Sequence, residues 1–369
     1  MLSRFGVTNF KSFKNQIILD LSNPSGYTFN PECVNNKHIK SAMLYGYNGC
    51  GKSNLALAMF DIIEHLTDKK RDEERYRYYL NADSDLPYAS FFYEFTFNEH
   101  LVRYEYRKSD YETILYESLT IDSQNVIFFD RESGNTDFNV SLAGTEYLNS
   151  RISDPTLSAL KYVKNNSVLG NDVYCNTFKE FYRFVEKMLF FRSLEDRTFI
   201  GLDTSPSYLI DGIVEAGLNN FEDFLRNAGL DYRLSLSEIA GKKEIMVDFE
   251  KCHLPYFEII SSGTKTLTLF YYWYHRVLKN NVPFLFIDEF DAFYHSKLAK
   301  AIVILLKKLD IQFILTTHNT SIMTNELMRP DCYFLMNKRC VRSLPECTDR
   351  ELREVHNIEK IYKSGAFDE

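Results

Sequence analysis

The fold is decided by Gly46-Tyr47-Asn48-Gly49-Cys50-Gly51-Lys52-Ser53, which fits the phosphate-binding pattern G-x-x-x-x-G-K-S. The apolar run from Ser41 to Tyr45 before it predicts a buried strand. The residues after it predict a helix over about 52–66, because four apolar side chains fall on one face: Leu55, Met59, Ile62 and Leu66. A strand, a glycine-rich loop and a helix in this order are the context that the pattern requires, and they indicate an α/β fold.

Each residue of this P-loop has an expected role. Asn48, Gly49 and Gly51 would place backbone N–H groups around phosphates, because glycine lets the chain turn inward there. The N-terminus of the following helix adds a partial positive charge. Lys52 would reach the β- and γ-phosphates, and Ser53 would hold Mg²⁺.

A second segment, Phe284-Leu285-Phe286-Ile287-Asp288-Glu289, is an apolar strand that ends in two carboxylates. Strands often end in acids, so this segment alone is only moderately specific. Together with the P-loop, it indicates a Walker B strand. Asp288 would then bind Mg²⁺ through water. Glu289 would orient or deprotonate the attacking water.

Two more segments become informative through their place in the order. Ser261-Ser262-Gly263-Thr264 stands before a predicted helix and, taken alone, indicates only a turn and an N-cap. His318 follows the apolar strand 313–317, and at this position it can contact a γ-phosphate. The complete order is P-loop, Ser-Ser-Gly helix, Asp-Glu strand and Thr-Thr-His.

This order resembles the ABC-type ATPase heads of SMC proteins, Rad-type repair ATPases, RecF and the OLD-like ATPases. The turn Asn9-Phe10-Lys11-Ser12-Phe13 looks like the N-terminal signature of the same group. The resemblance covers roughly residues 1–130 and 245–369. It implies that 260–264 is the ABC signature, that Asp291 takes the D-loop position and that His318 is the switch histidine.

The resemblance also implies cofactors and assembly. ATP and Mg²⁺ would be bound between two heads, with the P-loop of one head facing Ser261 and Gly263 of the other. ATP would hold the dimer together, and hydrolysis would loosen it. Lys11 would lie near the nucleotide, unless it is an ordinary solvated turn lysine. Gln124 is the candidate for the Q-loop among the three glutamines, which are Gln16, Gln124 and Gln312.

Departures from the group narrow the resemblance. The middle of the chain has no long heptad run and no Cys-x-x-Cys hook, unlike SMC arms and hooked repair ATPases. The ending Tyr362-Lys363-Ser364-Gly365-Ala366-Phe367 resembles the closing motif of the OLD-like branch. The TOPRIM nuclease domain that OLD proteins carry is therefore not expected in this chain. The chain is therefore most similar to stand-alone OLD-like ATPases of prokaryotic phage-defence systems, in which a separate protein is the effector.

Composition limits the alternatives. The 369 residues carry a net charge of −8, which argues against coating nucleic acid through global charge. The longest apolar runs are far shorter than the roughly 20 residues of a membrane-spanning helix. Seven scattered cysteines are typical of reduced intracellular thiols, so a cytoplasmic location without a membrane partner is expected.

We expect an ATP-dependent switch that controls a separate effector and forms a homodimer or a higher homo-oligomer. The alternative is a RecF-like repair ATPase that clamps DNA, for which a basic groove is needed. Three lysine pairs are candidates for the lining of such a groove: Lys69-Lys70, Lys242-Lys243 and Lys307-Lys308. For each pair, an ordinary solvated surface position is the simpler interpretation. A transporter-type subunit is disfavoured, because neither the Asn9–Phe13 turn nor the ending looks like that class.

The expected fold class is α/β, with a parallel-rich sheet that carries the P-loop. An antiparallel sheet is expected near residues 90–130, because apolar residues alternate with period two from Phe91 on either side of a turn at Asn98-Glu99. The predicted divisions are 1–144 and 236–369 for the two halves of the head. A helical lid over 145–235 would be inserted between them.

Overall fold

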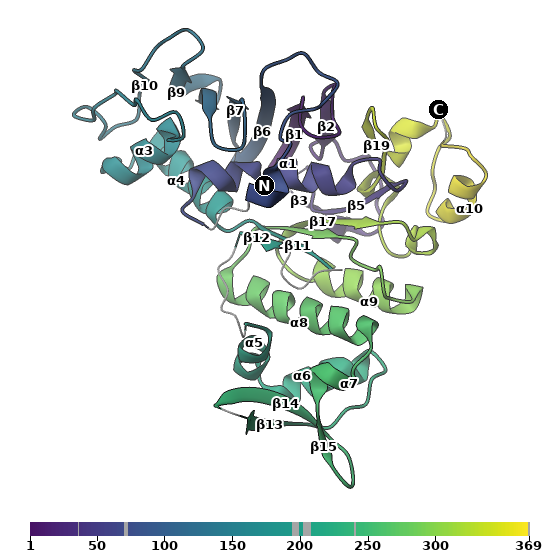
Figure 1. Ribbon diagram of the computed structural model, residues 1–369. Coiled ribbons are helices and arrows are strands. Elements are labelled where there is room, and N and C mark those ends of the chain that lie inside the picture. The colour runs from purple at the N-terminus through teal and green to yellow at the C-terminus, as the bar shows by residue number, and fades with distance from the viewer. Residues whose placement is uncertain (36, 70–72, 194–198, 202–207, 240, 368–369) are drawn as a thin grey trace.

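The structure, a computed structural model, describes the chain apart from residues 36, 70–72, 194–198, 202–207, 240 and 368–369. Its elements lie in layers (Figure 1): an antiparallel sheet, helix α1 (Lys52–Leu66), a mostly parallel sheet, and then helices α8 (Ser262–Asn280) and α9 (Ser296–Lys307). The predicted α/β fold with a parallel-rich sheet and a separate antiparallel sheet is confirmed.

The parallel-rich sheet places the site. Its strand order is β12 (Phe199–Ile200), β11 (Leu189–Arg192), β16 (Phe284–Asp288), β17 (Gln312–Thr317), β5 (Ser41–Gly46), β18 (Tyr333–Met336) and β19 (Val341–Ser343). The five central strands are parallel and the two edge pairs are antiparallel. The carboxyl ends of parallel strands meet at one edge, so the residues that follow β5, β16 and β17 lie close together.

Both faces of this sheet are covered, which explains why its strands are continuous apolar runs. Phe190 and Phe286 contact Phe60 of α1 on one face. Phe191, the next residue along β11, stacks on Trp273 of α8 on the other face.

The antiparallel sheet has the order β10 (Asn139–Val140), β9 (Gln124–Asp130), β8 (Ile114–Ile121), β7 (His100–Lys108), β6 (Ala89–Phe97), β1 (Leu2–Thr8) and β2 (Ile17–Asp20). The predicted hairpin is β6–β7. Asn98 and Glu99 both have positive φ between the paired residues Phe97 and His100. Such two-residue turns match the twist of the strands that they join.

Helix α1 differs from its prediction. One apolar face was expected, but α1 lies between the two sheets and is buried almost all round. Phe60 contacts the parallel-rich sheet, while the hydroxyl of Tyr93 on β6 donates to the carbonyl of Ala58. The pattern does not reveal this burial because the second buried face also carries polar residues, among them Asp61 and His65.

The polar side of α1 is neutralised inside the core. Asp61 is fully buried and faces the fully buried Lys108 of β7, with Nζ 3.1 and 3.2 Å from the two carboxylate oxygens. The hydroxyls of Tyr79 and Tyr106 also donate to Asp61, at 3.0 and 2.9 Å. A buried charge that keeps its partner and its hydrogen bonds is tolerated, whereas one that loses its partner is costly.

The segment 145–235, predicted as a helical lid, contains strands as well as helices. Helices α3 (Ala159–Asn166) and α4 (Val173–Glu186) pack against α1 and the antiparallel sheet, while β11 and β12 join the parallel-rich sheet. Of the helices that the structure describes between residues 145 and 235, α5 (Tyr208–Ala216) and α6 (Leu218–Asn227) lie beyond α8 (Figure 1). Short buried apolar runs such as β11 cannot be told from helix by periodicity alone. The division into domains stays a prediction, and its boundary at 235 falls inside β13 (Leu234–Ile239).

The remaining elements complete the layers. A small antiparallel sheet lies next to α6, formed by β13, β14 (Lys242–Asp248) and β15 (His253–Pro255). The others are β3 (Val34–Asn35), β4 (His38–Ile39), α2 (Glu73–Tyr76), α7 (Tyr256–Ile259) and α10 (Ile358–Lys363). Over the part of the chain that the structure describes, no helix combines the length and the apolar content that crossing a bilayer requires.

Candidate nucleotide-binding site

The P-loop connects β5 to α1. Gly49 and Gly51 have φ values of +76° and +111°, in the region that glycine adopts readily. Gly51 is also closely packed, since a Cβ there would lie 2.7 Å from the ring of Phe13. The loop therefore needs glycine at Gly51 for its backbone and for its space.

Lys52 and His318 meet at the loop, although they are far apart in the sequence. Lys52 is buried, and its Nζ donates to the carbonyl of Gly46 at 2.8 Å and to Nε2 of His318 at 3.0 Å. An ammonium group only donates, so Nε2 of His318 must accept. Burial lowers the pKa of Lys52, and burial together with the charge of Lys52 lowers the pKa of His318. The imidazole is thus held in its neutral form.

Ser53 and Asp288 form the candidate metal site. The hydroxyl of Ser53 donates to Oδ2 of Asp288 at 2.7 Å, and the hydroxyl of Thr316 donates to Oδ1 at 2.6 Å. Hydroxyl and carboxylate oxygens fit Mg²⁺, which keeps several waters and uses few protein ligands beside phosphates. The described residues contain no group of three His, Cys, Asp or Glu that could hold a metal ion.

Glu289 lies beside Asp288 in a left-handed conformation, with φ of +52°. Its N–H donates to Oγ1 of Thr316 at 2.7 Å, so one threonine fixes both acids. A non-glycine residue at positive φ costs conformational energy and tends to occur at functional positions. Nη2 of Arg192 lies 3.3 Å from Oε2 of Glu289. Sequence reasoning missed Arg192, because it assigned the surrounding segment to helix.

The Asn9–Phe13 turn does contact the P-loop region, but through other residues than Lys11. Nδ2 of Asn54 on α1 donates to Oγ of Ser12 at 2.8 Å, and Phe13 packs on Gly51. Nζ of Lys11 instead donates to the carbonyl of Arg77 at 3.1 Å. A role of Lys11 at the nucleotide stays a prediction.

The structure does not bring Gln124 to the site. Gln124 is exposed at the start of β9, directly after the turn at Asp122 and Ser123, and it pairs with Ile121. The strand β9 lies four positions from β1 in the antiparallel sheet. Gln124 was selected by elimination among three glutamines, whereas its hairpin position follows from the strand alternation around it.

The predicted signature residues lie at the start of α8. Ser261 is exposed, and its Oγ caps the helix by accepting from the N–H of Thr264 at 3.2 Å. Gly263 lies close to the segment after Asp291, since a Cβ there would be 3.3 Å from the carbonyl of Phe293. Among the contacts of the described residues, none joins Ser261 or Gly263 to the P-loop of the same chain.

Asp291 is buried close to the switch segment. Burial raises the pKa of its carboxyl, and the neighbouring Thr317 and Asn319, which flank His318, act in the opposite direction. The structure therefore places the predicted D-loop position near the loop that carries the predicted switch histidine. The assigned roles of both residues stay predictions.

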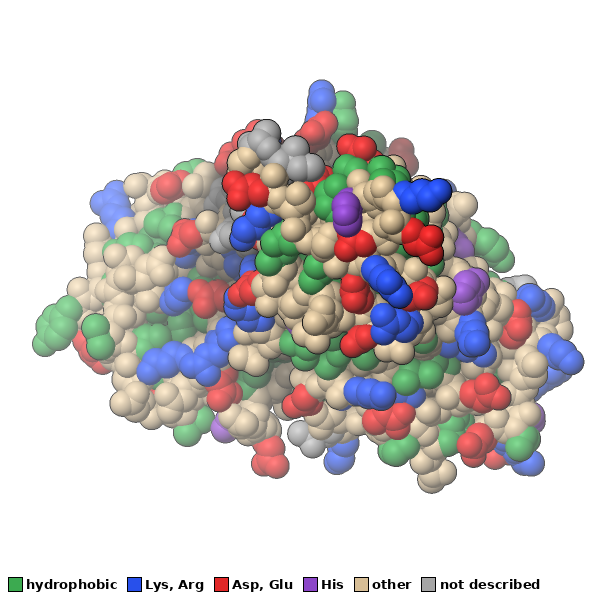
Figure 2. All heavy atoms as spheres, turned by 90° about the horizontal axis from the view of Figure 1, so that it is seen from below, with side chains coloured by type: hydrophobic (Ala, Val, Ile, Leu, Met, Phe, Trp, Pro, Cys, Tyr) green, Lys and Arg blue, Asp and Glu red, His purple; other side chains and the backbone are tan. Residues whose placement is uncertain are grey.

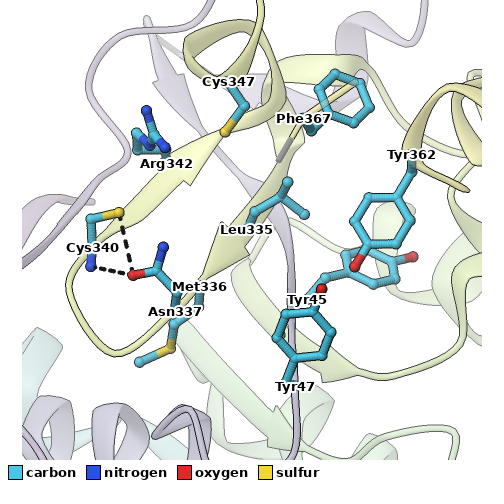
Figure 3. Close-up of a pocket in the computed structure, with 11 residues that line it drawn as sticks. Tyr45, Tyr47, Leu335, Met336, Asn337, Cys340, Arg342, Cys347, Tyr362 and Phe367 are labelled. Carbon is cyan, nitrogen blue, oxygen red and sulfur yellow. Dashed lines mark hydrogen bonds between the residues drawn. The ribbon is translucent and has the colours of Figure 1, made fainter. Parts of the chain in front are cut away.

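A cavity of about 450 Å³ adjoins the P-loop. Tyr45 and Tyr47 line it (Figure 3), as does Gly46 between them in the chain. Tyr362 and Phe367, from the closing segment of the chain, also line it. The ending that resembles the OLD-like motif thus packs next to the phosphate-binding loop.

The lysine pairs proposed for a DNA groove differ in their burial and in their partners. Lys307 is buried and pairs with Glu32 at 2.7 Å, while Lys308 is exposed. Lys69 donates to the carbonyl of Glu186, and Lys70 lies outside the described residues. The pair Lys242-Lys243 is exposed on β14. On the face shown in Figure 2, basic and acidic side chains are mixed.

The strand order, the loop and the paired acids define a P-loop domain of the α/β class. A family described as "AAA domain, putative AbiEii toxin, Type IV TA system" matches residues 41–324, and the chain belongs to this family. The family match and the observed fold confirm the predicted ABC-type P-loop ATPase head at this level. The nearness to the OLD-like branch stays a prediction.

Several solved structures are similar to the chain. One is an SMC head domain from Thermotoga maritima, with 16% identity and a TM-score of 0.45 over 93% of this chain and 98% of that one. Another is an SMC head bound to the C-terminal winged-helix domain of ScpA, with 18% identity and a TM-score of 0.49 over 94% and 99%. A third is an SMC head with an extended coiled coil, bound to the C-terminal domain of ScpA from Pyrococcus furiosus, with 14% identity and a TM-score of 0.47 over 94% and 97%. Comparison with curated proteins gives no match.

Proposed function

We propose that the chain binds and hydrolyses ATP as a switch, that two heads dimerise around ATP, and that the dimer controls a separate effector protein in anti-phage defence. The observation that carries the proposal is a chain of hydrogen bonds that links Ser53, Asp288, Thr316 and Glu289. It lies beside the hydrogen bond between Lys52 and His318. A slow ATPase suits such a switch, because the bound state must last.

The chemistry follows from these residues. Lys52 would exchange its backbone carbonyl partners for the β- and γ-phosphates. Ser53 and Asp288 would hold Mg²⁺, which supplies charge neutralisation at the phosphates. Glu289 would orient the attacking water or take its proton, and neutral His318 would donate from one ring nitrogen to the γ-phosphate once Lys52 has moved away.

The position of Ser261 supports the dimer. Ser261 is exposed at the N-terminus of α8, where a helix offers N–H groups and a partial positive charge to phosphate. Within the described residues it has no contact with its own P-loop, so a second copy would bring Ser261 and Gly263 to the nucleotide. Charge-assisted contacts across the bound nucleotide would then stabilise the pair.

The effector part of the proposal is supported by the family description, which names a toxin together with a Type IV TA system. The RecF-like alternative loses one of its three lysine pairs, since Lys307 is buried in an ion pair with Glu32.

Replacement of Lys52 by alanine is expected to weaken ATP binding about 10- to 100-fold, because hydrogen bonds to charged groups are worth about 1.5–3 kcal/mol each. Calorimetric titration with Mg-ATP measures the change. The matched control is Lys242→Ala, which removes an exposed lysine on β14 and should leave the affinity unchanged. Equal affinities for the Lys52→Ala and wild-type proteins would reject the proposed site.

A further inference from the structure

Strand β11 brings one arginine to the site. β11 runs parallel to β16, and Arg192 is in register with Asp288. The N–H of Ser193 donates to the carbonyl of Asp288 at 3.1 Å, which fixes the end of β11 at this edge of the sheet. The backbone therefore places Arg192 beside the two acids, at the edge where the P-loop also lies.

The side chain of Arg192 faces both acids. Its Nη2 lies 3.3 Å from Oε2 of Glu289, and its Nε lies 3.7 Å from Oδ2 of Asp288. Asp288 is already fixed by Ser53 and Thr316 and is fully buried. The side chain of Glu289 is 24% exposed, so the guanidinium has most to contribute to the position of this carboxylate.

We propose that Arg192 is a positioning residue for ATP hydrolysis that holds the carboxylate of Glu289 in place for the attacking water. A glutamate side chain has three rotatable bonds, and a general base must stay within hydrogen-bond reach of the proton that it takes. Thr316 fixes only the backbone of Glu289, and Arg192 fixes its far end. This inference rests on the proposed ATPase function.

The geometry also predicts what Arg192 does not do. Its side chain is 29% exposed, and ion pairs between partly exposed groups contribute little to stability. Loss of the guanidinium should therefore lower the rate of hydrolysis while the melting temperature and the affinity for ATP stay near their wild-type values. Lysine should rescue the rate only in part, because it lacks the planar fork of arginine.

The test compares Arg192→Ala, Arg192→Lys, Glu289→Gln and the double variant Arg192→Ala/Glu289→Gln. Single-turnover hydrolysis gives the rate, and calorimetric titration gives the affinity for Mg-ATP. Arg192→Ala is expected to hydrolyse ATP about tenfold more slowly with unchanged affinity, and Arg192→Lys should be intermediate. The double variant should be no slower than Glu289→Gln alone, because residues that act as one unit are not additive.

The control is Arg226→Ala, which removes an arginine paired with Asp223 at 2.9 Å on the exposed face of α6 and should match wild type. Additive rate losses in the double variant would overturn the inference, as would an affinity that falls as much as the rate. A wild-type protein without ATPase activity, or a fully active Glu289→Gln protein, would instead reject the proposed function and this inference with it.

Discussion

The Glu289→Gln protein is expected to hydrolyse ATP about 10²- to 10⁴-fold more slowly than the wild type and to bind it with the same affinity. Glutamine keeps the size of the side chain and cannot take a proton from water. The contacts that hold the nucleotide come from other residues, chiefly Lys52 and Ser53. Phosphate release under saturating Mg-ATP measures the rate, and calorimetric titration measures the affinity.

The matched control for Glu289→Gln is Glu326→Gln, which changes an exposed glutamate on the connection after β17. It should retain full activity, since Glu326 lies outside the set of residues around the P-loop. A Glu289→Gln protein that hydrolyses ATP within a factor of two of the wild type would show that another group activates the water.

Replacement of Asp61 by alanine is expected to lower the free energy of unfolding by about 3–5 kcal/mol, because it leaves Lys108 as an uncompensated charge in the core. The hydroxyls of Tyr79 and Tyr106 lose an acceptor in the same step. Denaturant titration followed by circular dichroism measures the loss.

Two further variants separate charge from packing at this position. Asp223→Ala, which breaks the exposed pair with Arg226, should change stability by less than about 0.5 kcal/mol. Asp61→Leu/Lys108→Met removes both buried charges and should recover much of the loss, since buried ion pairs can often be replaced by apolar residues. A loss below about 1 kcal/mol in Asp61→Ala would mean that Lys108 finds another partner or water.

The sequence predicted the features that depend on neighbouring residues. The P-loop is local, because its glycines, its strand and its helix are consecutive. The β6–β7 hairpin is also local, since strand alternation on both sides of Asn98-Glu99 determines the turn. The order of the Asp288 strand and His318 predicted that both lie at the phosphate site. Parallel strands align their carboxyl ends, so Asp288 lies beside Ser53 and His318 beside Lys52.

The features that were missed depend on contacts between distant segments. The burial of α1 on two sides arises from a second sheet, which its own apolar spacing does not encode. Arg192 reaches the acids only because β11 pairs with β16, and a four-residue apolar strand is ambiguous in a sequence. Lys307 appeared to be a surface lysine, but Glu32, from a distant part of the chain, pairs with it.

The central claim is that ATP joins two heads, and the most direct measurement is the mass of the Glu289→Gln protein by light scattering with and without Mg-ATP. Blocked hydrolysis should let the ATP-bound state accumulate. We expect the mass to double on addition of ATP, and we expect Ser261→Arg in the same background to abolish the increase. A Glu289→Gln protein that binds ATP and remains monomeric at saturation would contradict the account.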